Sequence, residues 1–184
     1  MISLEKKKPF NISKAAPGLN QVKVGLSWDP ATGIVADADA SVFMLNETGK
    51  IPNEDFFVFF NNLTSGDGAV IHSGDNRTGE GDGDDEEIHI NLGKVSNQVV
   101  QIMVVISIHN KEEGVHFGNV LNSSVRIYNQ STGSVLCQYN LSEKFDGCDS
   151  LVMGMFYRNG SEWEFEALGS AFEGGLGATV ELYS

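Results

Sequence analysis

Residues 21–28 read Gln-Val-Lys-Val-Gly-Leu-Ser-Trp, and this stretch decides the fold. Its large apolar side chains occupy every second position: Val22, Val24, Leu26 and Trp28. Because successive side chains of a β-strand point to opposite faces, this spacing gives the strand one apolar and one polar face. The stretch is therefore predicted to be a strand with one side against a core.

Similar β-branched, aromatic or alternating runs continue along the chain, at residues 40–45, 56–60, 87–92, 98–109, 124–128, 135–139, 151–157 and 163–168. Residues 56–60 are apolar on both faces, which is typical of a strand buried inside a sandwich. Residues 98–109 read as a central strand. Helical signals are weak, with short turns expected at 112–119, 141–145 and 171–176. The pattern predicts an all-β fold, a β-sandwich of about eight to ten mostly antiparallel strands with short helical turns.

Length, composition and charge limit the class of protein and the kinds of partner that it can bind. The 184 residues, 41% of them hydrophobic, are enough for one domain with a sizeable core, expected to span 1–184. A net charge of −13 disfavours nucleic acid and anionic membranes as direct partners, and favours cations and basic proteins. No stretch is long enough for direct membrane insertion. Cys137 and Cys148 do not make a disulfide framework, and residues 1–10 lack an apolar signal segment, so a cytoplasmic location is expected.

The most unusual segment is 75–87, Asp-Asn-Arg-Thr-Gly-Glu-Gly-Asp-Gly-Asp-Asp-Glu-Glu, which holds seven acidic residues and one arginine. At an effective dielectric constant of about 20, two like charges about 4 Å apart repel by roughly 4 kcal/mol. The segment therefore stays open and solvated unless a multivalent cation neutralises it. Carboxylates, an amide and backbone carbonyls freed by glycine are the ligands that Ca²⁺ prefers.

A second acidic element, residues 37–41, opens an expected strand, where Asp37, Asp39 and Ser41 share a face. Two carboxylates cannot fill the six to eight oxygen positions of Ca²⁺, so we expect the 75–87 segment to meet this strand and complete the site. An EF-hand does not fit. A loop starting at Asp82 would have Glu87 at its sixth position, where glycine is required, and Gly93 at its twelfth, where glutamate is required.

Residues 74–86 closely resemble the signature of the TerD family of tellurium-resistance and general-stress proteins that bind calcium. Residues 25–29, 37–41, 57–61 and 157–158 are similar to further motifs of that family, and the resemblance covers nearly the whole chain. It implies a β-sandwich with calcium sites, expected to hold two ions, built from the two acidic motifs. It implies no established catalytic activity.

The candidate metal ligands are the oxygen donors of the two acidic motifs: Asp37, Asp39, Asp75, Asn76, Gly79, Glu80, Asp82, Asp84, Asp85 and Glu86. Arg77 and Ser41 are expected to support ligands rather than bind the ion. Each acidic residue also has an ordinary alternative, in a solvated turn, a polar strand start, an Asx turn or a pair with Arg77. The four histidines have no spacing typical of a zinc site.

The favoured function is that of a calcium-binding, non-catalytic stress-response protein, in which calcium orders the loop and regulates binding to other stress-response proteins. One alternative is a metal-dependent phosphoesterase, because clustered carboxylates can hold two catalytic cations. No general base, nucleophile or cationic clamp is evident near the loop apart from Arg77. A calcium-dependent module for cyclic nucleotides or another ligand is a further alternative, although no glycine-rich phosphate cradle opens a helix.

Overall fold

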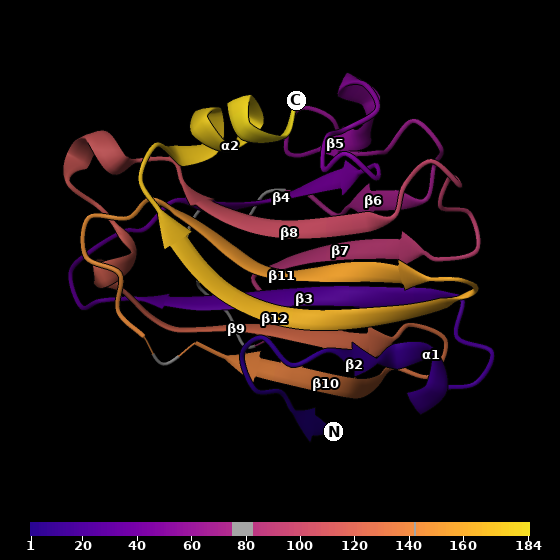
Figure 1. The fold of residues 1–184 in the computed structure, drawn as a ribbon. Helices are drawn as coiled ribbons and strands as arrows, with labels where there is room; N and C mark the ends of the chain where they lie inside the picture. The colour runs from indigo at the N-terminus through magenta and orange to yellow at the C-terminus, as the bar shows by residue number, and fades with distance from the viewer. Residues whose placement is uncertain (75–82, 142) are drawn as a thin grey trace.

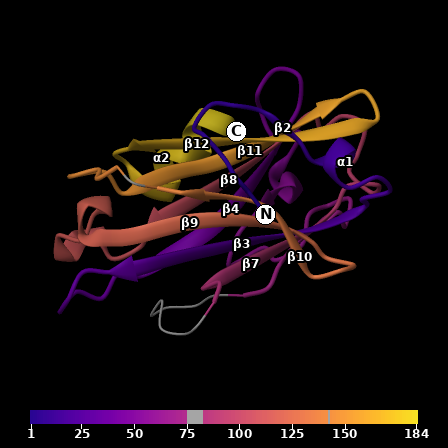
Figure 2. The same cartoon turned by 90° about the horizontal axis from the view of Figure 1, so that it is seen from below.

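The computed structural model describes residues 1–74, 83–141 and 143–184, and in this part of the chain two six-stranded sheets pack face to face (Figures 1 and 2). The first sheet has the order β1 (Ile2–Ser3), β10 (Ser134–Asn140), β9 (Val120–Asn129), β3 (Gln21–Pro30), β7 (Glu86–Asn91) and β6 (Val70–His72). The second has the order β2 (Phe10–Asn11), β12 (Glu162–Phe172), β11 (Ser150–Asn159), β8 (Gln101–Ile108), β4 (Ala38–Leu45) and β5 (Phe57–Val58). All pairs are antiparallel except β1 with β10.

The predicted all-β sandwich is confirmed, and the alternation of residues 21–28 gives its core face. Val22, Val24 and Leu26 are fully buried, and Trp28 is 1% exposed. The stretch at 98–109 forms β8, which lies inside the second sheet between β11 and β4. The structure has more strands than expected because each of the four sheet edges is a strand of two or three residues.

The expectation of a sandwich-interior strand at residues 56–60 is wrong. Only Phe57 and Val58 are in a strand, β5, and β5 is the edge of the second sheet. The run is apolar on both faces for another reason. Phe56 and Val58 enter the core, while Phe57 stacks on Phe43, with 4.5 Å between ring centroids, along the outer side of the sheet.

Short helical segments connect the strands: α1 (Ile12–Ala15) and the 3-10 turns η1 (Glu54–Phe56), η2 (Lys111–Glu113) and η3 (Phe117–Asn119). The turns expected at 112–119 are therefore present as η2 and η3. The turn expected at 171–176 is misplaced, because β12 runs to Phe172 and the helix α2 (Gly175–Tyr183) follows it. The described residues of 141–145 contain no helix.

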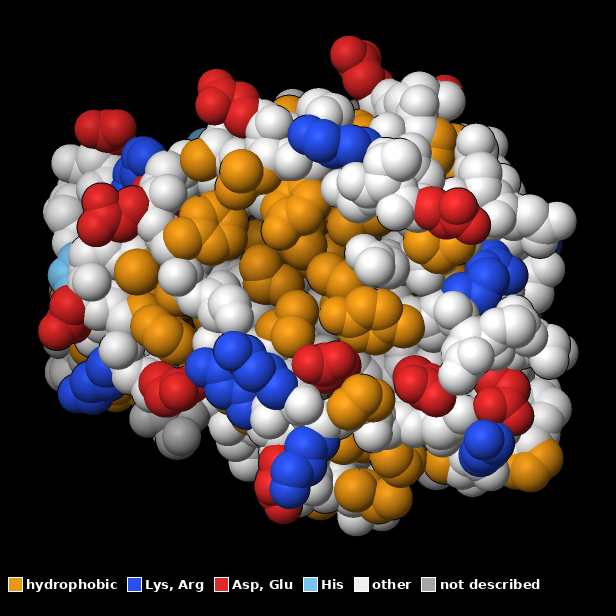
Figure 3. Space-filling view, viewed as in Figure 1, with side chains coloured by type: hydrophobic (Ala, Val, Ile, Leu, Met, Phe, Trp, Pro, Cys, Tyr) orange, Lys and Arg blue, Asp and Glu red, His pale blue; other side chains and the backbone are white. Residues whose placement is uncertain are grey.

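Helix α2 covers one side of the outer face of the second sheet, next to β8 and β11 (Figure 1). Beneath and beside it lies a second apolar cluster, centred on Phe43, Met103 and Met155. Figure 3 shows hydrophobic side chains gathered across the middle of this face, with acidic and basic side chains around them. No helix among the described residues is long and apolar enough to cross a membrane.

Candidate functional site

Strand β7 carries a carboxylate into the sandwich. Its inward positions are Glu86, Ile88 and Ile90, and the Glu86 residue is only 2% exposed. Burial of a charged carboxylate is costly unless its oxygens accept hydrogen bonds. Glu86 therefore needs a partner inside the molecule, and the facing sheet supplies one.

That partner is the backbone of Ala40 on β4. The Ala40 N–H donates to Glu86 Oε2 at 2.7 Å, and the Ala40 carbonyl lies 3.1 Å from His72 Nε2 on β6. Strand β5 pairs with β4 only at Val42 and Phe43, so Ala40 lies on an uncovered part of that edge. Two side chains of the first sheet thus take the place of a neighbouring strand of the second sheet.

His72 and Glu86 also interact with each other, with Nε2 and Oε2 3.4 Å apart. Burial lowers the pKa of His72, but the hydrogen bond and charge of Glu86 outweigh burial and raise it above its usual value, with a smaller contribution from Asp39. Gly74 N–H donates to His72 Nδ1 at 3.1 Å. The neutral ring therefore carries its proton on Nε2, where it can donate to the Ala40 carbonyl.

The first acidic motif, residues 37–41, includes Ala40 and lies at the start of β4. Asp39 is 7% exposed, and its Oδ2 lies 3.5 Å from His109 Nδ1. Asp37 is half-buried just before β4, and its backbone bonds to His109 N–H at 2.7 Å and to the Asn110 side chain at 3.1 Å. The buried Ser41 Oγ has no hydrogen-bond partner among the described residues. One contact joins the two acidic elements among the described residues, the bond from the Ala40 N–H to Glu86; the shared cation site stays a prediction.

Asp84 has a different environment, on the outer face of the first sheet. Its carboxylate lies against Gly25, where an added Cβ would come within 2.1 Å of Asp84 Oδ2. Lys23 Nζ is 3.4 Å from one carboxylate oxygen, and Arg126 Nε is 3.3 Å from the other. The Asp84 side chain is only 4% exposed. Its charge is thus already balanced by two cations on β3 and β9.

Asp85 extends the pairing of β3 with β7. Its N–H donates to the Leu26 carbonyl at 2.7 Å, and its Oδ2 accepts from the Trp28 N–H at 2.8 Å. Burial raises the pKa of Asp85; the bond to Trp28 lowers it, and the nearby charges of Asp29 and Asp84 raise it further. The neighbouring carboxylates thus disfavour the charged form of Asp85, and a cation bound beside it would reduce that effect.

The other half of the candidate ligands, with Arg77, lies outside the described residues: Asp75, Asn76, Gly79, Glu80 and Asp82. Within residues 1–74, 83–141 and 143–184, no group of three or more His, Cys, Asp or Glu side chains is arranged to hold a metal ion. In the described structure Glu86 contacts His72 and Ala40, Asp39 lies beside His109, and Asp84 is on the other face of the first sheet.

The whole-chain comparison identifies the family. The TerD domain family matches residues 1–183. The chain belongs to the TerD family. General stress protein 16U of Bacillus subtilis (strain 168) is 43% identical over 99% of this chain and 96% of its own length. Tellurium resistance protein TerD of Serratia marcescens is 40% identical over 99% and 96%. The crystal structure of a homologue of telluride resistance protein (TerD) from Streptomyces coelicolor A3(2) matches with a TM-score of 0.71 and 25% identity, over 89% of this chain and 96% of that one.

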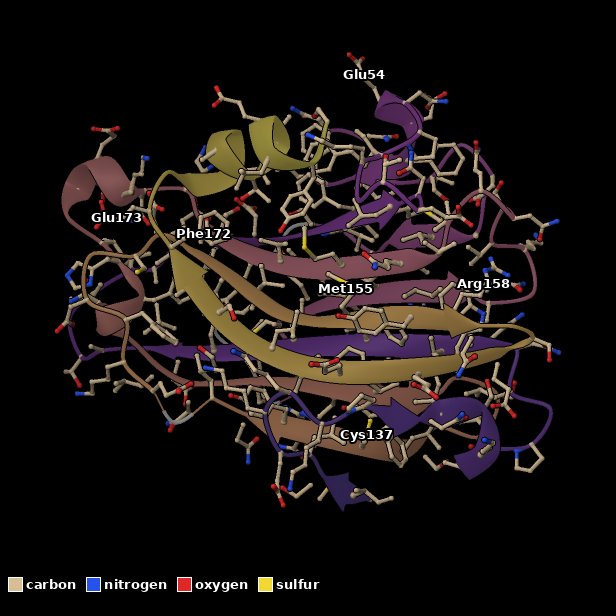
Figure 4. All side chains as sticks on the ribbon, viewed as in Figure 1. Glu54, Cys137, Met155, Arg158, Phe172 and Glu173 are labelled. Carbon is tan, nitrogen blue, oxygen red and sulfur yellow. The ribbon has the colours of Figure 1, made fainter. Side chains whose placement is uncertain are left out.

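Two residues from the family-like motifs of this chain, Gly25 and Arg158, have structural roles that the sequence did not reveal. Gly25 provides the space for the Asp84 carboxylate. The guanidinium of Arg158 donates to the carbonyls of Val95, Ser96 and Val99 at 2.9–3.1 Å, and lies over the ring of Trp163. Figure 4 shows Arg158 at the end of β11, next to the connection that it holds.

Sequence reasoning also missed three other residues of this TerD-family site: Lys23, His72 and Arg126. Lys23 and Arg126 each lie on the polar side of an alternating strand, where a charged side chain is ordinary. Only the pairing of β9, β3 and β7 brings them to Asp84, and that register is not visible in the sequence. For His72 the sequence did hold a signal: it lies only three positions before Asp75, the first residue of the acidic segment.

Proposed function

We propose that this protein is a calcium-binding, non-catalytic stress-response protein. One observation carries the proposal: the acidic strand β4 and the acidic end of β7 meet at Ala40, with Glu86 bonded to its N–H at 2.7 Å. Acidic side chains on both of the elements that this bond joins would suit a hard cation with many oxygen ligands. The names of the relatives, a general stress protein and a tellurium resistance protein, support the stress-response part.

The donor set fits Ca²⁺ better than a softer metal, because its members are oxygens. In this proposal Asp37, Asp39, Asp85 and Glu86 offer carboxylates from the described side of the site. The remaining oxygens come from Asp75, Asn76, Gly79, Glu80 and Asp82, and two ions are expected. Calcium would relieve the mutual repulsion of these acids, and so hold the two motifs together.

Within this proposal Asp84 fixes the end of the acidic segment, because Lys23 and Arg126 already neutralise its carboxylate. Arg126 also donates to the Gly83 carbonyl at 3.4 Å. These contacts hold residues 83 and 84 against the first sheet. We propose that calcium then changes the surface next to this anchored end, and thereby regulates binding to other proteins, in the cytoplasm.

Thermal unfolding tests the calcium proposal directly. At a free Ca²⁺ concentration of a hundred times Kd, binding to the folded state adds about 2.7 kcal/mol to the free energy of unfolding. In a domain of this size that corresponds to a rise in Tm of roughly 5–10 °C over the chelated protein. The measurement is a pair of melting curves in excess CaCl₂ and in EGTA.

The matched variants are Asp39→Asn, which keeps the side-chain shape in the proposed site, and Glu112→Gln, which removes one exposed charge elsewhere. We expect the calcium-dependent rise in Tm to shrink in Asp39→Asn and to persist in Glu112→Gln. Identical melting curves with and without calcium in the unsubstituted protein would sink the proposal.

A further inference from the structure

A groove separate from the acidic site lies between residues 51–62 and the C-terminal end of α2. Its volume is about 630 Å³, and it is lined by η1, by Phe57 and Phe59, and by Val180 and Ser184. Figure 1 shows η1 and β5 beside the end of α2. Cavities of about 300–1,000 Å³ are large enough to take a small molecule or the side chain of a partner with its flanking backbone.

Stacked aromatic rings form one wall of this groove. Phe57 and Phe59 lie nearly parallel, 11° apart, with 4.4 Å between ring centroids, and both are partly exposed. Phe57 stacks in turn on the fully buried Phe43. The Phe59 backbone exchanges two hydrogen bonds with Asn62, and the Asn62 side chain donates to the Phe57 carbonyl at 2.7 Å. The rings are thus held in place before any ligand arrives.

The charge around the rings is negative. Glu54 and Asp55 on η1 are the charged side chains of the lining, and no Lys, Arg or His contributes to it among the described residues. Figure 4 shows Glu54 projecting outward from η1. The C-terminal end of α2, where helix carbonyls concentrate partial negative charge, borders the same groove, and Lys50 Nζ already donates to the Leu182 carbonyl there at 2.9 Å.

These features together suit one kind of group. An aromatic face attracts a cation through its negative quadrupole, and a guanidinium stacks flat on such a face better than an ammonium does. Carboxylates at the rim can then accept its N–H donors as a charged pair. The net charge of −13 steers basic partners toward the protein over longer distances.

We propose that this groove binds an arginine-containing segment of a basic partner protein. The guanidinium stacks on the exposed ring of Phe59, and Glu54 and Asp55 pair with its charge. The aliphatic part of the arginine contacts Phe57 and Val180. This interaction does not depend on calcium, so it holds or fails separately from the function proposed above.

The test measures fluorescence anisotropy with a labelled, amidated hexapeptide that carries two arginines, at about 150 mM NaCl and in EGTA. The control peptide replaces both arginines with citrulline, which keeps the shape and removes the charge. We expect the citrulline peptide to bind at least about fivefold more weakly. Equal affinity for the two peptides, or no binding of the arginine peptide, overturns the proposal.

Two protein variants separate this groove from general attraction to an acidic surface. Phe59→Leu keeps an apolar side chain and removes the ring, and Glu54→Gln with Asp55→Asn removes the two lining charges. Each is expected to weaken arginine-peptide binding by about fivefold or more. The control, Glu112→Gln with Glu173→Gln, removes two exposed charges elsewhere and is expected to change affinity less than about twofold.

An equal loss of affinity in the control would mean diffuse electrostatic attraction and would contradict the proposal. If Phe59→Leu fails to fold, amide chemical shifts of the unsubstituted protein decide the question. Addition of the arginine peptide should then shift the signals of residues 51–62 and 180–184. Shifts confined to other residues would place the peptide elsewhere and overturn the assignment.

Discussion

At the scale of single residues, the contact between Gly25 and Asp84 explains why the polar face of β3 contains a glycine. Any side chain at position 25 would occupy the volume of the Asp84 carboxylate. Asp84 in turn holds Lys23 and Arg126, which lie over the outer face of the first sheet. The end of the acidic segment is thus fixed to β3 in two ways: the Asp84 carboxylate fills the space left by Gly25, and it pairs with Lys23 of the same strand.

We predict that Gly25→Ala lowers the free energy of unfolding by about 1–3 kcal/mol, because it displaces a largely buried carboxylate from its two cations. Urea unfolding in EGTA measures the change without any contribution from calcium. Gly93→Ala is the matched control, since a Cβ there meets its nearest atoms at an ordinary 3.5 Å and Gly93 has no positive φ. Equal stability of the two variants would contradict this role of Gly25.

Some single-residue roles could be predicted from the sequence and others could not. The buried faces of Val22, Val24 and Leu26 followed from alternation, because period-2 spacing is a local property. The environment of Asp84 did not, because its cations come from β3 and β9, and strand pairing brings them together only in the fold. In the sequence, Asp84 is indistinguishable from the acids beside it.

At the scale of elements, the start of α2 depends on one distant carboxylate. Gly174, at the N-cap, has no side-chain cap, and Asp149 Oδ1 instead accepts from the N–H groups of Gly174 and Gly175 at 2.8 Å each. Lys111 Nζ lies 3.0 Å from Asp149 Oδ2. This explains why sequence reasoning misplaced the helix: its first N–H groups donate to Asp149, just before β11, rather than to a local capping residue.

We predict that Asp149→Ala costs about 1–3 kcal/mol at neutral pH, because two helix N–H groups lose their acceptor. Burial raises the pKa of Asp149, but Lys111 and the two N–H groups outweigh it and leave the pKa below the usual value of 3.8. The charged form therefore stabilises the fold above pH 3.8, and this contribution disappears as the pH falls through the lowered folded-state pKa.

Urea unfolding at a series of pH values checks the sign of this effect. The stability difference between the unsubstituted protein and Asp149→Asn, which keeps an oxygen acceptor but not the charge, should be constant from pH 7 to about 5 and shrink below about 4. A difference that grows on acidification would contradict it. Glu112→Gln, on an exposed turn near Lys111, serves as the charge-matched control.

The strands also differ in how far the sequence could predict them. Strands of five or more residues were found from the sequence because alternation needs several residues to be visible. The edge strands β1, β2 and β5 have two residues each, too few for any period, so their pairing depends on neighbouring strands alone. The aromatic run at 56–60 was misread for a related reason: apolar side chains on both faces indicate burial on both faces, and cannot tell an edge covered by stacked rings from a central strand.

At the scale of the whole molecule, His72 and Glu86 lie on either side of residues 73–85 and contact the same residue, Ala40. Both ends of the acidic segment are therefore fastened to the second sheet by described contacts. The entropic cost of closing a flexible loop between fixed ends changes only slowly with the number of residues in the loop. The sandwich and the acidic segment should thus be largely independent in stability when no cation is bound.

We predict that replacing residues 75–82 with a Gly/Ser linker of equal length leaves unfolding in EGTA cooperative, and lowers its free energy by less than about 1 kcal/mol. The same protein should lose the rise in Tm that calcium causes. Circular dichroism and melting curves in EGTA and in CaCl₂ provide the measurement. A chain that no longer folds in EGTA would show that the segment is part of the core of the fold.

The short edge strands affect how this protein behaves when crowded with copies of itself. A sheet edge can recruit a second chain when it offers a long row of free backbone groups, and such recruitment leads to fibres. Here each edge strand has two or three residues. At Ala40, where β4 extends beyond β5, the backbone groups are already bonded to His72 and Glu86. Polymerisation through this part of β4 would first have to break a buried contact.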